Sequence, residues 1–224
     1  MGLQRPDGPD VDSTAHVLQL FSALALADAD VGGLMNHRSH GQGFSTYRRP
    51  DGWGEPHPDV TAVPVPYFGM PVEERIAYGD ELADWLLAQR DPEGFWPSYW
   101  WRGPYYATYW SLRLLRATGR DASIPAAMQV DTPAHALSCF ELGWAVGILA
   151  MDRRAHQAWQ TSFANLVSRR RRDGSWPGSD DLRVTDSRYR RPWSEPPLAD
   201  DHTRFYVDVE AILTRASILR ALTS

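Results

Sequence analysis

The chain has no lysine, one cysteine and no long hydrophobic run. All 23 basic side chains are arginines, which most simply indicates a GC-rich codon bias. A single cysteine, Cys139, excludes a disulfide within the chain and an all-cysteine zinc site, and it fits a reducing compartment. No window approaches the roughly 18 apolar residues of a membrane span, and the start lacks a charged-then-apolar signal. We therefore expect a soluble, cytoplasmic protein.

The chain also lacks an excess of positive charge. Its formal net charge is −5, so nothing in the composition favours nucleic acid or an anionic membrane surface as a partner. At 224 residues the chain is long enough to bury a full hydrophobic core. We expect a single domain over residues 1–224.

Aromatic residues, in contrast, are abundant. Ten tryptophans and nine tyrosines occur, and many cluster in turns such as residues 94–101, Gly-Phe-Trp-Pro-Ser-Tyr-Trp-Trp. Such a surplus is compatible with ordinary core packing or with a stiff aromatic wall around a cavity.

The hydrophobic pattern predicts helices and no sheet. Apolar segments that begin at polar or proline-containing turns are expected as inner helices at about 12–26, 59–69, 105–118, 134–151 and 207–222. Segments at about 72–90 and 153–170 are amphipathic and are expected in an outer layer. Pro64 and Pro66 should shorten or kink the second apolar helix. Since no stretch alternates apolar and polar residues at length, the predicted fold class is all-α.

The connections between these segments repeat. Residues 89–97 (QRDPEGFWP) are echoed by residues 171–177 (RRDGSWP), and residues 42–47 (QGFSTY) are a weaker echo. Repeated helix pairs that share a common turn are typical of stacked or closed helical arrays. We expect an α/α toroid of paired inner and outer helices.

The first helix begins with two acids. In Asp10-Val11-Asp12-Ser13-Thr14, the Asp, Ser and Thr side chains are all good helix caps, because their oxygens accept the unpaired N–H groups of the first turn. Taken alone, the two carboxylates are explained by capping. They are also two acids fixed at the start of an apolar helix.

Four segments together resemble the acid-bearing α/α domain of terpene cyclases of the squalene–hopene cyclase type. Residues 10–15 (DVDSTA) resemble the D-x-D-D-T-A acid motif, and residues 43–47 (GFSTY) resemble the G-G-W-G-x-Y segment. Residues 59–62 match the D-V-T-A segment, and the two repeated turns resemble Q-W repeats. The resemblance covers nearly the whole chain in the same order, and it implies an α/α toroid.

The resemblance also implies a reaction, in which an isoprenoid alkene or epoxide is protonated and the resulting carbocation cyclises. Asp12 would be the general acid, Asp10 its carboxylate neighbour, and Asp59 part of the polar support behind it. The residues expected to line the cavity against the cation are Tyr47 and Trp100 by position, Tyr206 by a looser alignment, and Tyr106 by its place at the start of an inner helix.

This chemistry is reasonable on physical grounds. Two neighbouring carboxyl groups in a dry site cannot both ionise cheaply, so one proton is retained on the pair. A carbocation needs stabilisers that do not react with it, and aromatic faces provide them. Water must be kept out until the cation is quenched. Initiation of this kind needs no metal and no cofactor.

The chain departs from the family pattern in three ways. Ser13 stands where the motif has its last Asp, and Val63 stands where the family has a His that supports the acid. His57 is a candidate replacement for that His, as are His37 and His40 in the long loop at about 28–58. Family members also carry a second α/α domain, so here the ring is expected to be incomplete. A homodimer or a separate partner chain would then complete the cavity.

Two alternatives to a cyclase stay open. In the first, the chain is a non-catalytic subunit with a degenerate acid motif that binds an isoprenoid or a partner. In the second, it is a relative of the cyclases that opens an epoxide or isomerises a smaller terpenoid. A strained epoxide tolerates a weaker acid than an alkene does.

Overall fold

The computed structural model describes residues 10–23, 32–39, 42–63, 72–130, 136–192, 194–209 and 211–223. Its α-helices are α1 (Val11–Ala23), α2 (Gly32–Met35), α3 (Pro58–Thr61), α4 (Val72–Gln89), α5 (Tyr105–Ala117), α6 (Ala126–Val130), α7 (Cys139–Ala150), α8 (His156–Ser168) and α9 (Ile212–Thr223). Short 3-10 turns occur at Gly52–Gly54 and Arg153–Ala155, and two strands at β1 (Leu182–Val184) and β2 (Arg204–Tyr206).

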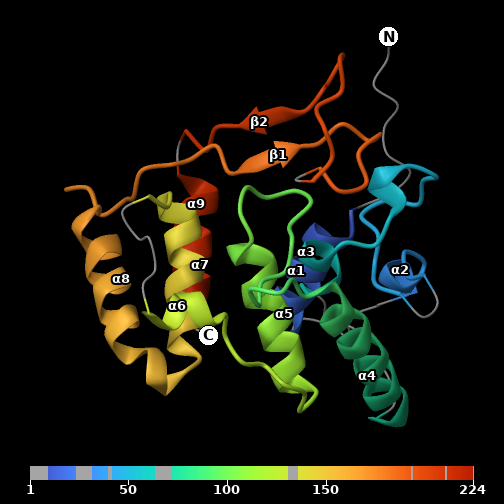
Figure 1. The fold of residues 1–224 in the computed structure, drawn as a ribbon, viewed down its shortest axis with the longest axis horizontal. Coiled ribbons are helices and arrows are strands. Elements are labelled where there is room, and N and C mark those ends of the chain that lie inside the picture. Colours follow the sequence, from blue (N-terminus) through green and yellow to red (C-terminus); the bar gives the residue numbers. More distant parts are fainter. Residues whose placement is uncertain are drawn as a thin grey trace.

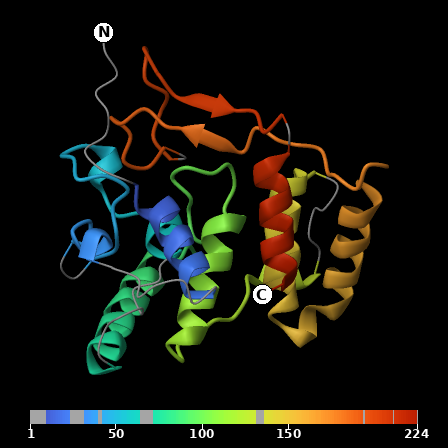
Figure 2. The same cartoon turned by 180° about the vertical axis from the view of Figure 1, so that it is seen from behind.

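Helices α8, α7, α5 and α4 stand side by side in that order (Figure 1). Helix α7 packs against α5, α8 and α9, and α5 packs in turn against α3 and α4. Seen from behind, α1 and α9 lie on the same face of the molecule, with α9 in front of α7 (Figure 2). The two strands lie across one end of the helices (Figure 1).

Helix α7 is the most apolar helix, and its sequence defines its start. The Ser138 hydroxyl accepts a hydrogen bond from the Glu141 N–H (3.0 Å), and the Glu141 carboxylate accepts one from the Ser138 N–H (3.2 Å). This reciprocal capping box satisfies two donors that would otherwise lack partners. On its α9 side, a Cβ at Gly143 would lie 2.8 Å from Cγ1 of Ile218. Helices α7 and α9 can therefore pack closely only because residue 143 is a glycine.

Most of the predicted helices occur, with shifted ends. The segments expected at 12–26, 72–90, 105–118, 153–170 and 207–222 correspond to α1, α4, α5, α8 and α9. The helix expected at 134–151 begins only at Cys139, and that expected at 59–69 is described only as α3, since Pro64 and Pro66 lie outside the described residues. Within the described part of the chain, no helix is long and apolar enough to cross a membrane.

The prediction of a chain without any sheet is wrong. Strands β1 and β2 pair antiparallel, with Leu182 opposite Tyr206 and Val184 opposite Arg204. Each strand has three residues, too few for an alternating hydrophobic pattern to be recognised. The middle residue of β1 is moreover a buried arginine, Arg183, whose Nε–H donates to the carbonyl of Tyr99 at 2.9 Å. This contact ties the hairpin to the loop at Tyr99, and the flanking Leu182 and Val184 pack against the hydrophobic core.

The two repeated turns have the same structure. In the first, the Trp96 indole donates to the Leu86 carbonyl at 2.6 Å, and in the second the Trp176 indole donates to the Leu166 carbonyl at 2.8 Å. Each turn contains a glycine with positive φ, at position 94 or 174, a conformation that suits glycine. Each tryptophan thus ties the turn back to the last part of the helix before it, α4 or α8.

Candidate active site

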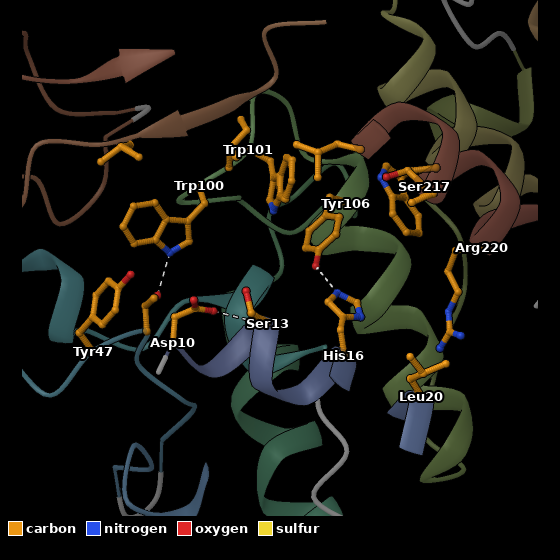
Figure 3. Close-up of a pocket in the computed structure, with 16 residues that line it drawn as sticks. Asp10, Ser13, His16, Leu20, Tyr47, Trp100, Trp101, Tyr106, Ser217 and Arg220 are labelled. Atoms are coloured by element: carbon orange, nitrogen blue, oxygen red, sulfur yellow. Dashed lines mark hydrogen bonds between the residues drawn. The ribbon is translucent and has the colours of Figure 1, made fainter. Parts of the chain in front are cut away.

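A pocket of about 610 Å³ opens between α1, α5, α7, α9 and β1. Its aromatic lining comes from four separate parts of the chain and consists of Tyr47, Trp100, Trp101, Tyr106 and Trp144 (Figure 3). Apolar side chains of α1, α9 and β1 complete much of the remaining wall, namely Leu20, Leu213, Ala216, Leu182 and Val184. The polar groups in the wall are few: Asp10, Ser13, His16, Thr46, Ser217 and Arg220.

The aromatic rings of the pocket wall pack against one another. The Tyr47 ring meets the Trp100 ring edge to face at 6.4 Å, and the Trp101 ring lies 4.9 Å from the Tyr106 ring. Trp144 meets Tyr106 edge to face at 5.2 Å. Such a wall is rigid and apolar, and the faces of its rings can stabilise a cation without reacting with it.

The start of α1 forms one end of the pocket. The Asp10 carboxylate accepts a hydrogen bond from the Ser13 N–H at 2.8 Å, as a helix cap does, and both residues line the pocket (Figure 3). The backbone of Asp12 lies in the first turn of α1, whereas its side chain lies outside the described part of the structure. Capping and a place in the pocket wall are therefore compatible for Asp10.

Asp59 lies behind the aromatic wall and does not line the pocket. It is buried, and one of its carboxylate oxygens, Oδ2, accepts hydrogen bonds from the backbone N–H groups of Tyr99 (2.7 Å) and Trp100 (2.8 Å). Burial raises the pKa of Asp59 to about 6, and the two N–H donors act in the opposite direction. The structure thus gives Asp59 a contact that fixes the backbone of Trp100.

From the opposite side, the Tyr99–Trp100 segment is held by the hairpin. Arg183 and Thr185 both donate to the Tyr99 carbonyl, and the Trp100 indole donates to the Thr46 hydroxyl at 2.7 Å. The Trp100 side chain is thereby fixed at both its backbone and its ring.

Two of the predicted site residues, His57 and Tyr206, do not line this pocket. His57 is buried and stacks on Tyr99 at 3.9 Å, and its Nε2–H donates to the Gly52 carbonyl, so it faces a second pocket on the other side of Tyr99. Burial lowers the pKa of His57 to about 4, with a smaller contribution from Arg183. Tyr206 lies on β2 with 54% of its surface exposed and is not part of the pocket lining. The hairpin, which the sequence did not predict, carries Tyr206 away.

Sequence reasoning missed His16, Trp101, Trp144 and Arg220, which all line the pocket. His16 could have been found, because it follows Asp12 by four residues and Ser13 by three and therefore shares their face of the helix. Arg220 and Trp144 gave no such signal, since their position depends on how α7 and α9 pack. Among the described residues, no group of three or more His, Cys, Asp or Glu side chains comes together to hold a metal ion.

The fold is that of class II terpene cyclases, as comparison with solved structures shows. The type II terpene cyclase MstE from Scytonema matches with a TM-score of 0.75 at 24% identity, over 95% of this chain and 72% of that one. The ent-copalyl diphosphate synthase from Streptomyces platensis matches with a TM-score of 0.63 at 22% identity, over 96% of this chain and 41% of that one.

The match to a curated relative covers a short segment of the chain. Copalyl diphosphate synthase from Streptomyces anulatus is 45% identical over 47 residues, which is 21% of this chain and 9% of that enzyme. No family model matches the chain. The chain therefore corresponds in sequence to a small part of this curated relative, and the likeness of the whole chain lies in its fold.

Proposed function

We propose that this protein is a proton-initiated terpene cyclase of the class II type that acts on a linear isoprenoid. The observation that carries this proposal is the aromatic pocket of about 610 Å³ with the acidic start of α1 in its wall. An isoprenoid chain is apolar and flexible, so a largely apolar pocket of this size suits it. The similar cyclase MstE is described in complex with geranylgeranyl dihydroxybenzoate as its substrate, which supports a prenyl chain as the ligand.

In this proposal Asp12 is the general acid and Asp10 its carboxylate neighbour. Asp10 and Asp12 are two residues apart in the sequence, and in this proposal their carboxyl groups share a proton, because the second negative charge is unfavourable in an apolar pocket. The proton passes from Asp12 to a terminal alkene or epoxide of the substrate, and the cation forms inside the pocket. Ser13 contributes a hydroxyl where the family motif has a further acid.

The aromatic wall then stabilises the cation. Tyr47, Trp100 and Tyr106 line the pocket, and their ring faces attract positive charge. Asp59 acts as a positioning residue, because its carboxylate holds the Trp100 backbone. Neither this initiation nor the cyclisation steps require a metal ion.

We also infer that residues 1–224 form one domain, an α/α toroid. The packing of α7 against α5, α8 and α9, and the two equivalent turns after α4 and α8, support repeated helix pairs. The small hairpin is an addition to this helical plan.

A product assay tests the function. The purified protein is incubated with linear isoprenoids, supplied as diphosphates, free alcohols, squalene and terminal epoxides, and the products are analysed by gas chromatography–mass spectrometry. We expect a cyclic product from the wild type and a loss of about 10²-fold or more in its formation by Asp12→Asn, since a general acid contributes that much. The matched control is Asp84→Asn on the exposed side of α4, which removes only a surface ion pair with Arg120.

The substrate that reacts distinguishes alkene protonation from epoxide opening. Absence of turnover by correctly folded wild-type protein across the whole panel would reject the cyclase and favour a binding or partner subunit. Equal activity in Asp12→Asn and wild type would reject Asp12 as the acid.

A further inference from the structure

Strand β2 is an edge strand with an open outer side. Among the described residues it pairs with β1 alone, whereas β1 also pairs on its other side with the chain at Trp101. In both views β1 lies between β2 and the helices (Figure 1 and Figure 2). The edge of the sheet that faces away from the helices is therefore formed by β2.

The side chains along this edge are exposed and mostly apolar. The exposed fractions of its apolar residues range from 46% at Phe205 to 79% at Val209. Natural proteins usually protect such an edge with lysine, proline or a bulge, and the stretch 203–209 (TRFYVDV) contains neither lysine nor proline. An exposed apolar edge of this kind is a template on which another strand can pair.

The backbone of β1 indicates which groups of β2 point outward. The N–H of Arg183, in the middle of β1, donates to the Trp100 carbonyl at 2.9 Å and so points away from β2. The other two residues of β1 therefore bond to the first and last residues of β2, which lie opposite them. Since hydrogen-bonding direction alternates along a strand, the N–H and C=O groups of Phe205 and of the following Val207 point to the open side.

The edge is complementary to itself when two copies run antiparallel about a twofold axis at Tyr206. Phe205 then lies opposite Val207 of the second copy, and the outward backbone groups of these residues can bond to one another. The Val207 carbonyl already accepts the Val209 N–H at 2.9 Å, but a carbonyl oxygen can accept two hydrogen bonds. Every contact of such a pairing occurs twice by symmetry.

Charge favours this register. It places the exposed Arg204 opposite Asp208 of the second copy, and a cross-strand pair of opposite charges is stabilising. The Asp208 carboxylate is held in place, because its oxygens accept the N–H groups of Leu213 (3.2 Å) and Thr214 (2.8 Å) at the start of α9. A shift of two residues in either direction would separate Arg204 from Asp208.

We propose that two copies of this chain pair through β2 into one antiparallel sheet, with Tyr206 of both copies on the twofold axis. The two hairpins then form a continuous sheet in the order β1-β2-β2-β1. Such a sheet would also support β1, whose Leu182 and Val184 line the pocket, but the pairing does not depend on the reaction that takes place there.

Cysteine cross-linking tests the register. The two copies of residue 206 would form a non-hydrogen-bonded pair with Cα atoms about 4.5 Å apart, which is within the range of a disulfide. With a mild oxidant, Tyr206→Cys should therefore give a disulfide-linked dimer.

Val209→Cys is the matched control for cross-linking. Val209 is more exposed than Tyr206, so random collisions would favour it. In the proposed pairing, however, its two copies lie six residue positions apart, roughly 20 Å at 3.4 Å per residue. We expect at least about tenfold less cross-linked dimer than from Tyr206→Cys, since a disulfide cannot span that distance. Equal cross-linking of the two variants, or none in Tyr206→Cys, would contradict the register.

Analytical ultracentrifugation of the protein without added cysteines tests the dimer itself, at concentrations up to about 0.1 mM. Val207→Pro removes an outward N–H, and Arg204→Asp places like charges opposite each other. Because each change acts twice, we expect each to raise the Kd of the dimer at least about tenfold. Arg153→Asp makes the same charge change at an exposed residue in the 3-10 turn before α8 and should associate as the wild type does.

Two results would overturn the dimer. A wild type that stays monomeric at the highest concentration would leave the β2 edge to another protein or to no partner. A dimer whose Kd is the same in wild type, Val207→Pro and Arg204→Asp would form through another surface. Neither result depends on whether the protein converts an isoprenoid, so the proposed function is tested separately.

Discussion

At the scale of single residues, Asp59 combines a buried carboxyl with two backbone donors. Burial favours its neutral form and the N–H groups of Tyr99 and Trp100 favour its charged form, and burial is the larger effect. Its other oxygen, Oδ1, is buried without a hydrogen-bond partner among the described residues. The site thus includes an ionisable group whose charge is unfavourable to folding near neutral pH.

Asp59 and the buried histidines should make stability depend on pH in opposite directions. Because the pKa of Asp59 rises from 3.8 to about 6 on folding, its stabilising contribution is present below pH 4 and is lost as the pH rises to about 6. The pKa of His57 falls from 6.5 to about 4, so its contribution is present above pH 6.5 and is lost as the pH falls. Each slope is at most about 1.4 kcal/mol per pH unit.

Urea denaturation between pH 4 and 7 measures these slopes. Relative to wild type, the free energy of unfolding of Asp59→Asn should rise more steeply with pH, and that of His57→Gln less steeply. The exposed His156, which stacks on Trp159, provides the control variant His156→Gln, which should follow the wild-type curve. Parallel curves for all four proteins would contradict both pKa shifts.

At this scale the sequence located part of the site. Asp10, Ser13, Tyr47, Trp100 and Tyr106 were expected there and all line the pocket, although their chemical roles stay predictions. They lie at helix starts or in motif segments, where local sequence restricts the position of a side chain. The placements of His57 and Tyr206 depend on long-range contacts of loops and of the hairpin, which local sequence does not specify.

At the scale of elements, the two equivalent turns differ in how deeply their tryptophans are buried. Trp96 is completely buried, whereas Trp176 is half-buried. Both indoles make the same hydrogen bond to the helix before them, so the difference between the two positions is mainly one of packing.

Replacement of these tryptophans should therefore have unequal effects. We expect Trp96→Ala to lower the free energy of unfolding by about 3–5 kcal/mol, the range for a large buried aromatic side chain, and Trp176→Ala to lower it by less. Chemical denaturation of both variants beside wild type measures the difference. Equal losses would mean that the shared hydrogen bond, rather than burial, dominates.

Helices were predictable at this scale and the strands were not. Apolar spacing over ten or more residues identified α1, α4, α5, α8 and α9, because a helix repeats its buried face every three to four residues. The observed ends of the helices differ from the predicted ones where a capping residue determines the first residue of the helix, as Ser138 does for α7. The three-residue strands pair across about 20 residues of sequence, and Arg183 of β1 contacts the distant loop at Tyr99, so no local pattern predicts them.

At the scale of the whole molecule, the pocket joins distant parts of the chain. Its wall includes Asp10 near one end of the described residues and Arg220 near the other. A ligand in the pocket touches several of these parts at once and should stabilise them together. Binding of this kind raises the free energy of unfolding according to ligand concentration.

Binding can therefore be measured without turnover. For Asp12→Asn with geranylgeraniol at about 100 times its Kd, we expect about 2.7 kcal/mol of stabilisation and a rise in Tm of roughly 5–10 °C. Ala216 lines the pocket on α9, and Ala216→Trp should fill the space and remove the rise. A rise of equal size in both proteins would mean that the alcohol binds elsewhere.

The place of α9 in the pocket wall also affects how the protein is made. At about 5–20 residues per second, a ribosome needs roughly 10 to 40 s between the synthesis of α1 and that of α9. During this time the α7 surface at Gly143, against which Ile218 of α9 packs, has no α9 beside it. The pocket between α1, α5, α7, α9 and β1 is therefore complete only after α9 has been synthesised.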